Sequence, residues 1–120
     1  MIKKQTKGDL YQNEALKSFA ELISNINLLK NKNFGCPWQN IQTHETLIPY
    51  LIEESHEFIN SIKNNDKENM QEELGDLLLQ IMLHSEIERE KKLFSINDVI
   101  NSLNHKIKSR PPYILSLIHI

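Results

Sequence analysis

The sequence predicts an all-α fold, a bundle-like single domain of four helices. Three observations favour this class. Apolar residues recur at the i, i+3, i+4, i+7 spacing of amphipathic helices, no run alternates β-branched and aromatic residues as strands do, and the 120 residues include only three glycines and four prolines. Hydrophobic residues make up 39% and charged residues 25%, which is typical of a globular domain. We therefore expect one domain over residues 1–120, with a frayed end over residues 1–9.

Composition and charge argue against several classes of function. Fourteen Lys and Arg residues against sixteen Asp and Glu residues give a net charge of −2, which argues against a nucleic-acid partner. No apolar run approaches the roughly 20 residues that span a bilayer, and residues 1–9 are too polar for a signal peptide, so we expect no membrane association. The single cysteine, Cys36, cannot form an internal disulfide, which favours a cytoplasmic protein.

The first helix is predicted over residues 10–30. Its apolar stripe consists of Leu16, Phe19, Ala20, Ile23, Ile26 and Leu29. A loop is expected over residues 31–43, because Gly35 and Pro37 interrupt the periodicity there.

The second helix is predicted from about Thr46 to Lys63. Thr46 is a suitable N-cap, which places Pro49 in the first turn, where a missing N–H does no harm. The apolar stripe of this helix consists of Leu47, Leu51, Phe58 and Ile62.

The third helix is predicted over residues 67–91 and is apolar on two sides. One side carries Met70, Leu74, Leu77, Leu78 and Ile81. The opposite side carries Leu79 and Leu83. We therefore expect burial on both sides, one of them against a second subunit.

A fourth helix is predicted between a capping box at Ser95 and Asp98 and the helix-stopping pair Pro111–Pro112. Residues 115–120 are apolar, follow that stop without a cap, and match the translation of an adapter common in sequencing libraries. We expect them to be a non-native tail and the natural chain to continue differently.

Two pairs of acidic residues carry the predicted chemistry. Glu54 and Glu57 in the second helix, and Glu73 and Asp76 in the third, are i, i+3 neighbours flanking an apolar stripe. The short link makes the two helices antiparallel neighbours, so the pairs can converge. Converging carboxylates repel one another unless a cation lies between them, and oxygen-only ligands suit Mg²⁺ or Mn²⁺. Since Mg²⁺ keeps coordination places for phosphate oxygens, a phosphoanhydride substrate is indicated.

The acidic pairs, Gly75 and the histidines of these helices also allow other interpretations. A solvated acidic face explains either pair taken alone, because glutamate is a good helix former. Gly75, in the middle of a helix, costs about 1 kcal/mol relative to alanine and favours a close neighbour there, either a packed helix or a ligand. A di-iron bundle needs two Glu-x-x-His motifs, and the sequence has only Glu53-x-x-His56. The histidines are therefore interpreted as surface or core-edge residues: His44, His56, His84 and His105.

An ordered set of motifs spans most of the chain. It consists of Gly35-Cys36-Pro37-Trp38, Gln42-Thr43-His44, Glu53-Glu54-x-x-Glu57 and Glu73-Leu74-Gly75-Asp76. In this order and at these separations, the set resembles the MazG family of nucleoside triphosphate pyrophosphohydrolases over about residues 33–115. The resemblance implies the all-α NTP pyrophosphatase fold and a homodimer. It also implies Mg²⁺-dependent hydrolysis of an NTP or dNTP to the monophosphate and pyrophosphate, which removes unwanted nucleotides.

The resemblance also implies roles for individual residues. The metal ligands would be Glu54, Glu57, Glu73 and Asp76. Glu53 is the candidate for positioning the attacking water. Lys106 and Arg110 would reach the phosphates, which cationic side chains complement, although a solvated basic helix end is the alternative. Trp38 either borders the base of the substrate or, as we favour, plugs the end of the bundle.

The chain departs from the family pattern at two places. Gln39 stands where the family usually has aspartate, and Arg110-Pro111-Pro112-Tyr113-Ile114-Leu115 stands in place of RHPHVF. Two alternatives therefore remain. One is a non-catalytic helical dimerisation domain with a vestigial metal site, and the other is a relative of narrow specificity for dUTP, dCTP or phosphoribosyl-ATP.

Overall fold

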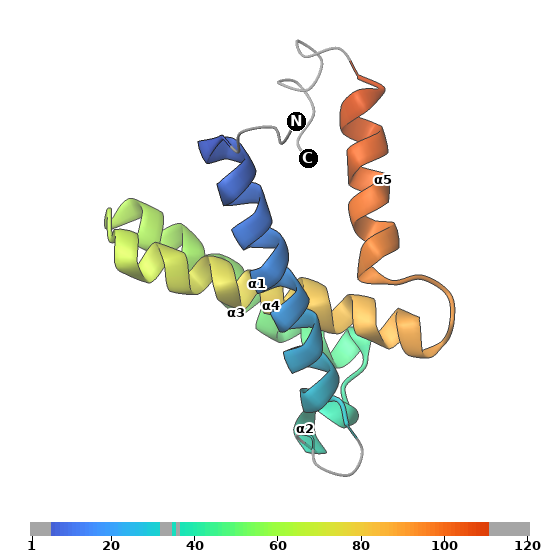
Figure 1. Cartoon of the computed structure of the whole chain (residues 1–120). Helices are drawn as coiled ribbons and strands as arrows, with labels where there is room; N and C mark the ends of the chain where they lie inside the picture. The colour runs from blue at the N-terminus through green and yellow to red at the C-terminus, as the bar shows by residue number, and fades with distance from the viewer. Residues whose placement is uncertain (1–5, 32–34, 36, 111–120) are drawn as a thin grey trace, which may run out of the picture. The chain divides into compact units, whose positions relative to one another are not determined.

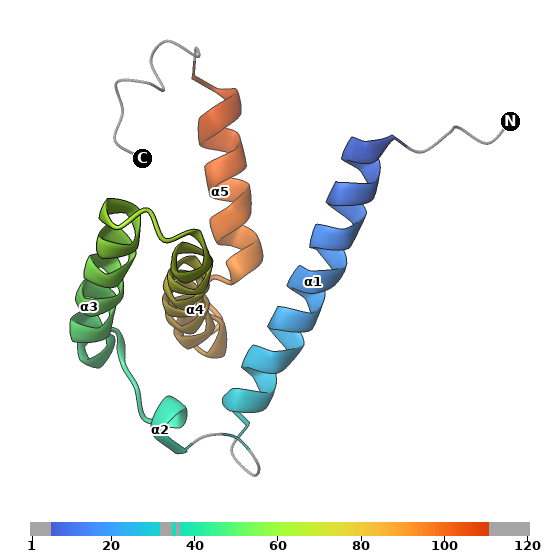
Figure 2. The same ribbon diagram turned by 90° about the vertical axis from the view of Figure 1, so that its left-hand side faces the viewer.

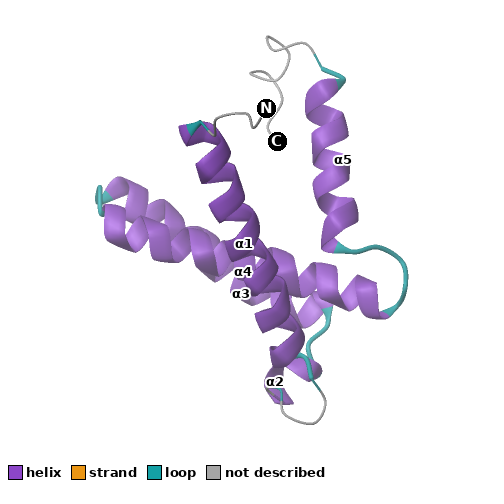
Figure 3. Cartoon of the chain, in the orientation of Figure 1, coloured by secondary structure: helices purple, strands orange, loops and turns teal. Residues whose placement is uncertain are grey.

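All regular structure in the described part of the chain is helical, which confirms the all-α class (Figures 1 and 3). The structure is a computed structural model and describes residues 6–31, 35 and 37–110. Its helices are α1 (Lys7–Leu29), α2 (Pro37–Asn40), α3 (His44–Lys63), α4 (Lys67–Glu90) and α5 (Ile96–Lys108). The four long helices correspond to the predicted ones, and α2 lies in the predicted loop. The chain forms two compact units, residues 1–42 and 43–120, and the single domain stays a prediction.

In the first unit, α1 begins earlier than the sequence indicated. Thr6 is its N-cap: the Thr6 hydroxyl accepts a hydrogen bond from the Asp9 N–H (3.1 Å), and the Asp9 carboxylate accepts one from the Thr6 N–H (3.1 Å). This capping box explains why residues 7–9 are helical rather than frayed. The predicted apolar stripe is partly buried: Ile26 is buried, Phe19, Ile23 and Leu29 are half-buried, and Leu16 is 62% exposed.

Gly35 and α2 both make hydrogen bonds to the end of α1. The Gly35 N–H donates a hydrogen bond to the Asn31 carbonyl oxygen (2.7 Å), and Asn40 Nδ2 donates to the same oxygen (3.3 Å). A Cβ at position 35 would overlap the carbonyl oxygens of Leu29 and Asn31, so this approach requires glycine. Trp38 belongs to α2, but its side chain lies outside the described part of the chain, and its predicted role is not tested.

In the second unit, α3 and α4 pack side by side as an antiparallel hairpin (Figure 2). A turn over residues 64–66 joins them, and Asn65 adopts a φ of 50°, a left-handed conformation that asparagine tolerates better than most residues. The Asp66 side chain then caps α4 by accepting a hydrogen bond from the Asn69 N–H (3.1 Å). The predicted antiparallel arrangement is therefore confirmed.

The start of α3 differs from the prediction. Its N-cap is Thr43, not Thr46: the Thr43 hydroxyl accepts from the Thr46 N–H (3.2 Å), and the Thr46 hydroxyl accepts from the Thr43 N–H (2.8 Å). The helix therefore begins at His44, and Pro49 lies in its second turn rather than its first. The helix consequently lacks the hydrogen bond that an N–H at position 49 would donate to the Glu45 carbonyl.

The core of the hairpin lies on one side of α4. Leu83 and Ile87 are buried with Leu47 of α3, and Leu79 packs against them. On the other apolar side of α4, Leu74 is 49% exposed in the single chain. Burial of that side against a second subunit therefore stays a prediction.

The last helix, α5, leaves α4 at a steep angle (Figures 1 and 2). The predicted capping box is confirmed, since the Ser95 N–H donates to the Asp98 carboxylate (2.9 Å). Ile96 at the start of α5 is half-buried, and the apolar residues that follow it in the helix are exposed: Val99, Ile100, Leu103 and Ile107. The predicted stop at Pro111–Pro112 and the tail over residues 115–120 lie outside the described residues. Among the helices described, we find none with the length and apolar content to cross a bilayer.

Candidate metal centre

Three carboxylates from two helices meet on the α3–α4 hairpin. Glu54 and Glu57 belong to α3 and Glu73 belongs to α4, and each offers an oxygen that lies within 4.8 Å of the others. The geometry of the hairpin explains this meeting, because Glu57 and Glu73 both lie eight residues from Asn65 in the turn. We call these three residues the acidic cluster.

The acidic cluster contains buried oxygens that have no hydrogen-bond partner in the described part of the chain. Glu73 is only 8% exposed and Glu54 is half-buried, whereas Glu57 is exposed. Glu54 Oε2 and Glu73 Oε2 are both buried without a hydrogen-bond partner. A buried carboxylate oxygen is costly unless a proton or a cation neutralises it. The donor set therefore fits a bound cation.

The pKa values in the acidic cluster reflect the same burial, together with repulsion between the carboxylates. The pKa of Glu73 is raised to about 7, mainly by burial, then by a hydrogen bond to Glu57 and by the charges of Glu57, Asp76 and Glu54. The pKa of Glu54 is raised as well, first by burial and then by the charges of Asp76, Glu57 and Glu53. Further negative charge is thus disfavoured here, and a divalent cation would relieve the repulsion.

The other predicted site residues are placed less closely. Asp76 and Glu53 are exposed, and their charges act on Glu54, although neither belongs to the set of oxygens within 4.8 Å. Lys106, on α5, and Arg110, just after it, are also exposed. The charges that shift the pKa values of Glu54 and Glu73 come from carboxylates, and neither Lys106 nor Arg110 contributes to these shifts.

Comparison with known proteins decides the family. Residues 42–115, more than half of the chain, match the model of the MazG nucleotide pyrophosphohydrolase domain. This chain belongs to the MazG family. It is 47% identical over 96 residues to the nucleoside triphosphate pyrophosphohydrolase/pyrophosphatase MazG of Thermotoga maritima, an alignment that covers 80% of this chain and 37% of that protein. It is 32% identical over 95 residues to the nucleoside triphosphate pyrophosphohydrolase of Escherichia coli K12, covering 79% of this chain and 36% of that protein.

The MazG fold is also found in a solved structure. The crystal structure of a mazG-related protein from Thermotoga maritima superposes with a TM-score of 0.63 at 27% identity, over 83% of this chain and 86% of that chain. The resemblance seen in the motifs is thereby confirmed. This MazG chain spans little more than a third of the length of the two curated relatives described above.

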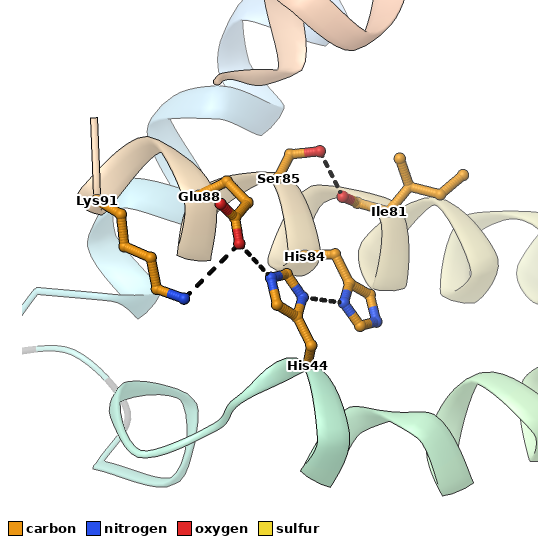
Figure 4. Close-up of polar contacts among 6 residues, drawn as sticks. All are labelled: His44, Ile81, His84, Ser85, Glu88 and Lys91. Carbon is orange, nitrogen blue, oxygen red and sulfur yellow. Dashed lines mark hydrogen bonds and ion pairs between the residues drawn. The ribbon is translucent and has the colours of Figure 1, made fainter. Parts of the chain in front are cut away.

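The MazG domain also contains a polar contact between α3 and α4 that the sequence did not predict (Figure 4). His44 Nδ1, on α3, lies 2.7 Å from His84 Nδ1, on α4, and the two rings are parallel with centroids 5.0 Å apart. His44 Nε2 lies 2.5 Å from Glu88 Oε1, and Lys91 Nζ lies 3.7 Å from the same oxygen. The second ring nitrogen of His84, Nε2, is buried without a partner. We call His44, His84 and Glu88 the histidine clasp.

The protonation states of the histidine clasp follow from its surroundings. The hydrogen bond from His44 lowers the pKa of Glu88, and the nearby charges of Lys91 and His44 lower it further, so Glu88 is a carboxylate. Burial lowers the pKa of His84, and the charge on His44 lowers it further. A neutral His84 is therefore favoured beside a His44 that donates to Glu88.

Proposed function

We propose that this MazG domain hydrolyses nucleoside triphosphates, NTP or dNTP, to the monophosphate and pyrophosphate in the cytoplasm, with Mg²⁺ or Mn²⁺ at the acidic cluster. The buried, unpartnered oxygens of Glu54 and Glu73, which lie beside Glu57, carry this proposal. A donor set made of carboxylate oxygens suits a hard divalent cation better than zinc. The names of the Thermotoga and E. coli relatives support the pyrophosphohydrolase activity.

The proposed ligands are Glu54, Glu57, Glu73 and Asp76. A cation bound by them would supply positive charge to phosphate oxygens and lower the pKa of a bound water. Glu53, which is exposed and adjacent to the cluster, is the proposed acceptor of the proton that the attacking water loses. The water oxygen bonds to the α-phosphorus, the bond from that phosphorus to the bridging oxygen breaks, and pyrophosphate leaves with the electron pair.

The remaining proposed contacts bind the rest of the substrate. Lys106 and Arg110 are proposed to contact the phosphates, because cationic side chains complement their charge. Trp38 is a candidate to border the base, with a plug at the end of the bundle as the favoured alternative. Replacing Lys106 or Arg110 with alanine should therefore raise the KM for the triphosphate more than it lowers kcat.

We also propose that the domain forms a homodimer. Several apolar residues of the hairpin outside its core are exposed: Ile48, Ile52, Leu74, Leu78 and Ile81. Exposed apolar residues in this number favour burial against another surface. Light scattering on the purified chain tests this proposal, and a strictly monomeric mass would contradict it.

Turnover is the test of the proposed reaction. The purified protein is incubated with a panel of NTPs and dNTPs, with Mg²⁺ or with EDTA, and the products are identified. We expect the monophosphate and pyrophosphate, only in the presence of metal. Glu57→Gln and Asp76→Asn should abolish turnover, whereas Glu72→Gln, a change at an exposed neighbour of Glu73, should retain it.

Three results would overturn the proposal or narrow it. Undiminished turnover by Glu57→Gln would contradict the assigned ligands. No turnover of any nucleotide by a folded protein would favour a non-catalytic dimerisation domain, in which residues 110–115 have lost the RHPHVF motif. Turnover confined to dUTP, dCTP or phosphoribosyl-ATP would identify a relative of narrow specificity.

A further inference from the structure

The histidine clasp ties the open end of the α3–α4 hairpin. His44 is the first residue of α3, and His84 and Glu88 lie in the last two turns of α4. The opposite end is closed by the turn over residues 64–66. The acidic cluster lies between these two ties.

The histidine clasp and the acidic cluster are separated by rigid helix. Glu54 follows His44 by ten residues on α3, and Glu73 precedes His84 by eleven on α4. At 1.5 Å per residue, both separations are roughly 15 Å along the helix axis. A shift of α3 along its axis at His44 therefore displaces Glu54 by nearly the same amount, because the backbone hydrogen bonds of the helix fix its rise.

The histidine clasp requires that one of the two Nδ1 atoms carries no proton. Two nitrogens 2.7 Å apart share one proton, so one Nδ1 donates and the other accepts. His44 Nε2 must donate to Glu88, since a carboxylate only accepts. A neutral His44 then accepts at Nδ1 from His84, and a cationic His44 donates to it. The contact is lost only when both rings are cationic.

The charged groups around the histidine clasp come from both helices. Glu88 and Lys91 on α4 lie beside His44, and Glu45 is its neighbour on α3. Burial, and then the charge on His44, lowers the pKa of His84. His84 is partly buried and faces His44. At neutral pH this set of charges favours one proton between the rings.

We propose that the histidine clasp sets the register at which Glu54 and Glu57 meet Glu73, so that His44 and His84 are positioning residues for divalent-cation binding. This inference rests on the proposed function, since it takes the acidic cluster to be a cation site. The oxygens of the cluster must converge within 4.8 Å, and Mg²⁺ demands ligand distances close to 2.0–2.1 Å, about 0.2 Å of tolerance. A small slip between α3 and α4 therefore lowers affinity without unfolding the hairpin.

Two substitutions at His84 separate its hydrogen bond from its packing. His84→Phe keeps an aromatic ring beside His44 but removes the nitrogen that pairs with it. His84→Asn places an amide near the position of Nδ1, and that amide can donate or accept whichever way His44 is protonated. Ile87→Val is the matched control, because it weakens the core of the hairpin without touching the histidine clasp.

The experiment is calorimetric titration of the metal-free full chain with Mg²⁺, and separately with Mn²⁺. At pH 7.5 we expect His84→Phe to bind about fivefold more weakly than the wild type, which corresponds to the loss of one hydrogen bond. His84→Asn and Ile87→Val should stay within about twofold of it. At pH 5.5 the affinity of His84→Asn should gain on that of the wild type, since only the wild type has two rings that acid makes cationic. The ratio of the two proteins cancels the protonation of the acidic cluster, which they share.

The outcomes distinguish this inference from the proposed function. Wild-type affinity in His84→Phe, or equal losses in His84→Phe and His84→Asn, would overturn the positioning role while leaving the cation site intact. A loss in Ile87→Val as large as that in His84→Phe would also overturn it, because general loosening would then explain the effect. Absence of any binding by the wild type would overturn both the inference and the proposed function.

Discussion

The acidic cluster and the histidine clasp lie on the same two helices, but their charges are balanced in opposite ways. In the acidic cluster, like charges meet, two buried oxygens have no partner, and the pKa values of Glu54 and Glu73 are raised. In the histidine clasp, three of the four ring nitrogens have a partner, His84 Nε2 being the exception, and the pKa of Glu88 is lowered. The difference shows which site needs a ligand. The histidine clasp is held by its own charges, whereas the acidic cluster is stabilised only by protons or by a cation from outside.

The largest effect is expected at the buried leucine between the two sites. Leu47 is fully buried against Leu83 and Ile87, three residues after His44. Leu47→Ala should lower the free energy of unfolding by about 3 kcal/mol, because it removes buried methyl groups and leaves a cavity. It should also weaken cation binding, since it loosens the contact between α3 and α4. Urea denaturation measures the first effect.

An exposed leucine provides the control for Leu47→Ala. Leu74 is half exposed on the opposite side of α4, so Leu74→Ala should cost less than about 1 kcal/mol in a single chain. Equal losses for the two variants would contradict the assignment of the core to the side of α4 that carries Leu83.

The two sites should respond to pH with opposite signs in the metal-free protein. The folded pKa of Glu73 is about 7, above the ordinary value of 4.5, so its contribution to stability is complete below pH 4.5 and is lost as the pH rises through 7. The lowered pKa values of Glu88 and His84 act in the other direction, and their contribution is lost as the pH falls.

Glu73→Gln separates these two contributions. It should be more stable than the wild type at pH 8 in EDTA, and this advantage should shrink at pH 5.5, where the wild-type carboxyl is protonated. Chemical denaturation at both pH values measures the difference. A stability difference that is independent of pH would show that Glu73 does not titrate in this range.

The smallest effect is expected at Gly75, beside the acidic cluster. The sequence favoured a close neighbour here, but no heavy atom of the described chain lies within 4 Å of a Cβ placed at this position. Gly75→Ala should therefore raise the free energy of unfolding of the single chain by about 1 kcal/mol. A loss of dimer mass or of turnover in this variant would instead locate the close neighbour in a partner chain or in the substrate.

The fold and the acidic cluster could be predicted because both depend on local pattern and on hairpin symmetry. Helical periodicity located the four long helices, and the short link implied that acids equally far from the turn would meet. The same symmetry could have found the histidine clasp. Residue 86 is as far from Asn65 as His44 is, and His84 and Glu88 flank it. The histidine clasp was not predicted because each histidine was interpreted singly, as a surface or core-edge residue, and not as a partner of another across the hairpin.

Other features could not be predicted because the sequence offers two alternatives and helical periodicity does not choose between them. Thr43 and Thr46 are both suitable caps, and their reciprocal hydrogen bonds select Thr43. The third predicted helix has two apolar sides, and periodicity does not say which one faces α3; in the structure the side of Leu83 packs on Leu47. Roles for Lys106, Arg110 and Trp38 require the substrate or a partner chain, so they stay predictions.

The most direct test of the account is calorimetric titration of the metal-free protein with Mg²⁺ at pH 6.5, in two buffers of different ionisation enthalpy. At this pH Glu73 is largely protonated, because its pKa is about 7, so a cation at the acidic cluster must displace protons. We expect the wild type to bind Mg²⁺ with a heat that differs between the buffers by the release of up to one proton, and Glu73→Gln to lose both the affinity and the proton release. Binding that is unchanged in Glu73→Gln, or that releases no proton, would contradict a cation site at Glu54, Glu57 and Glu73.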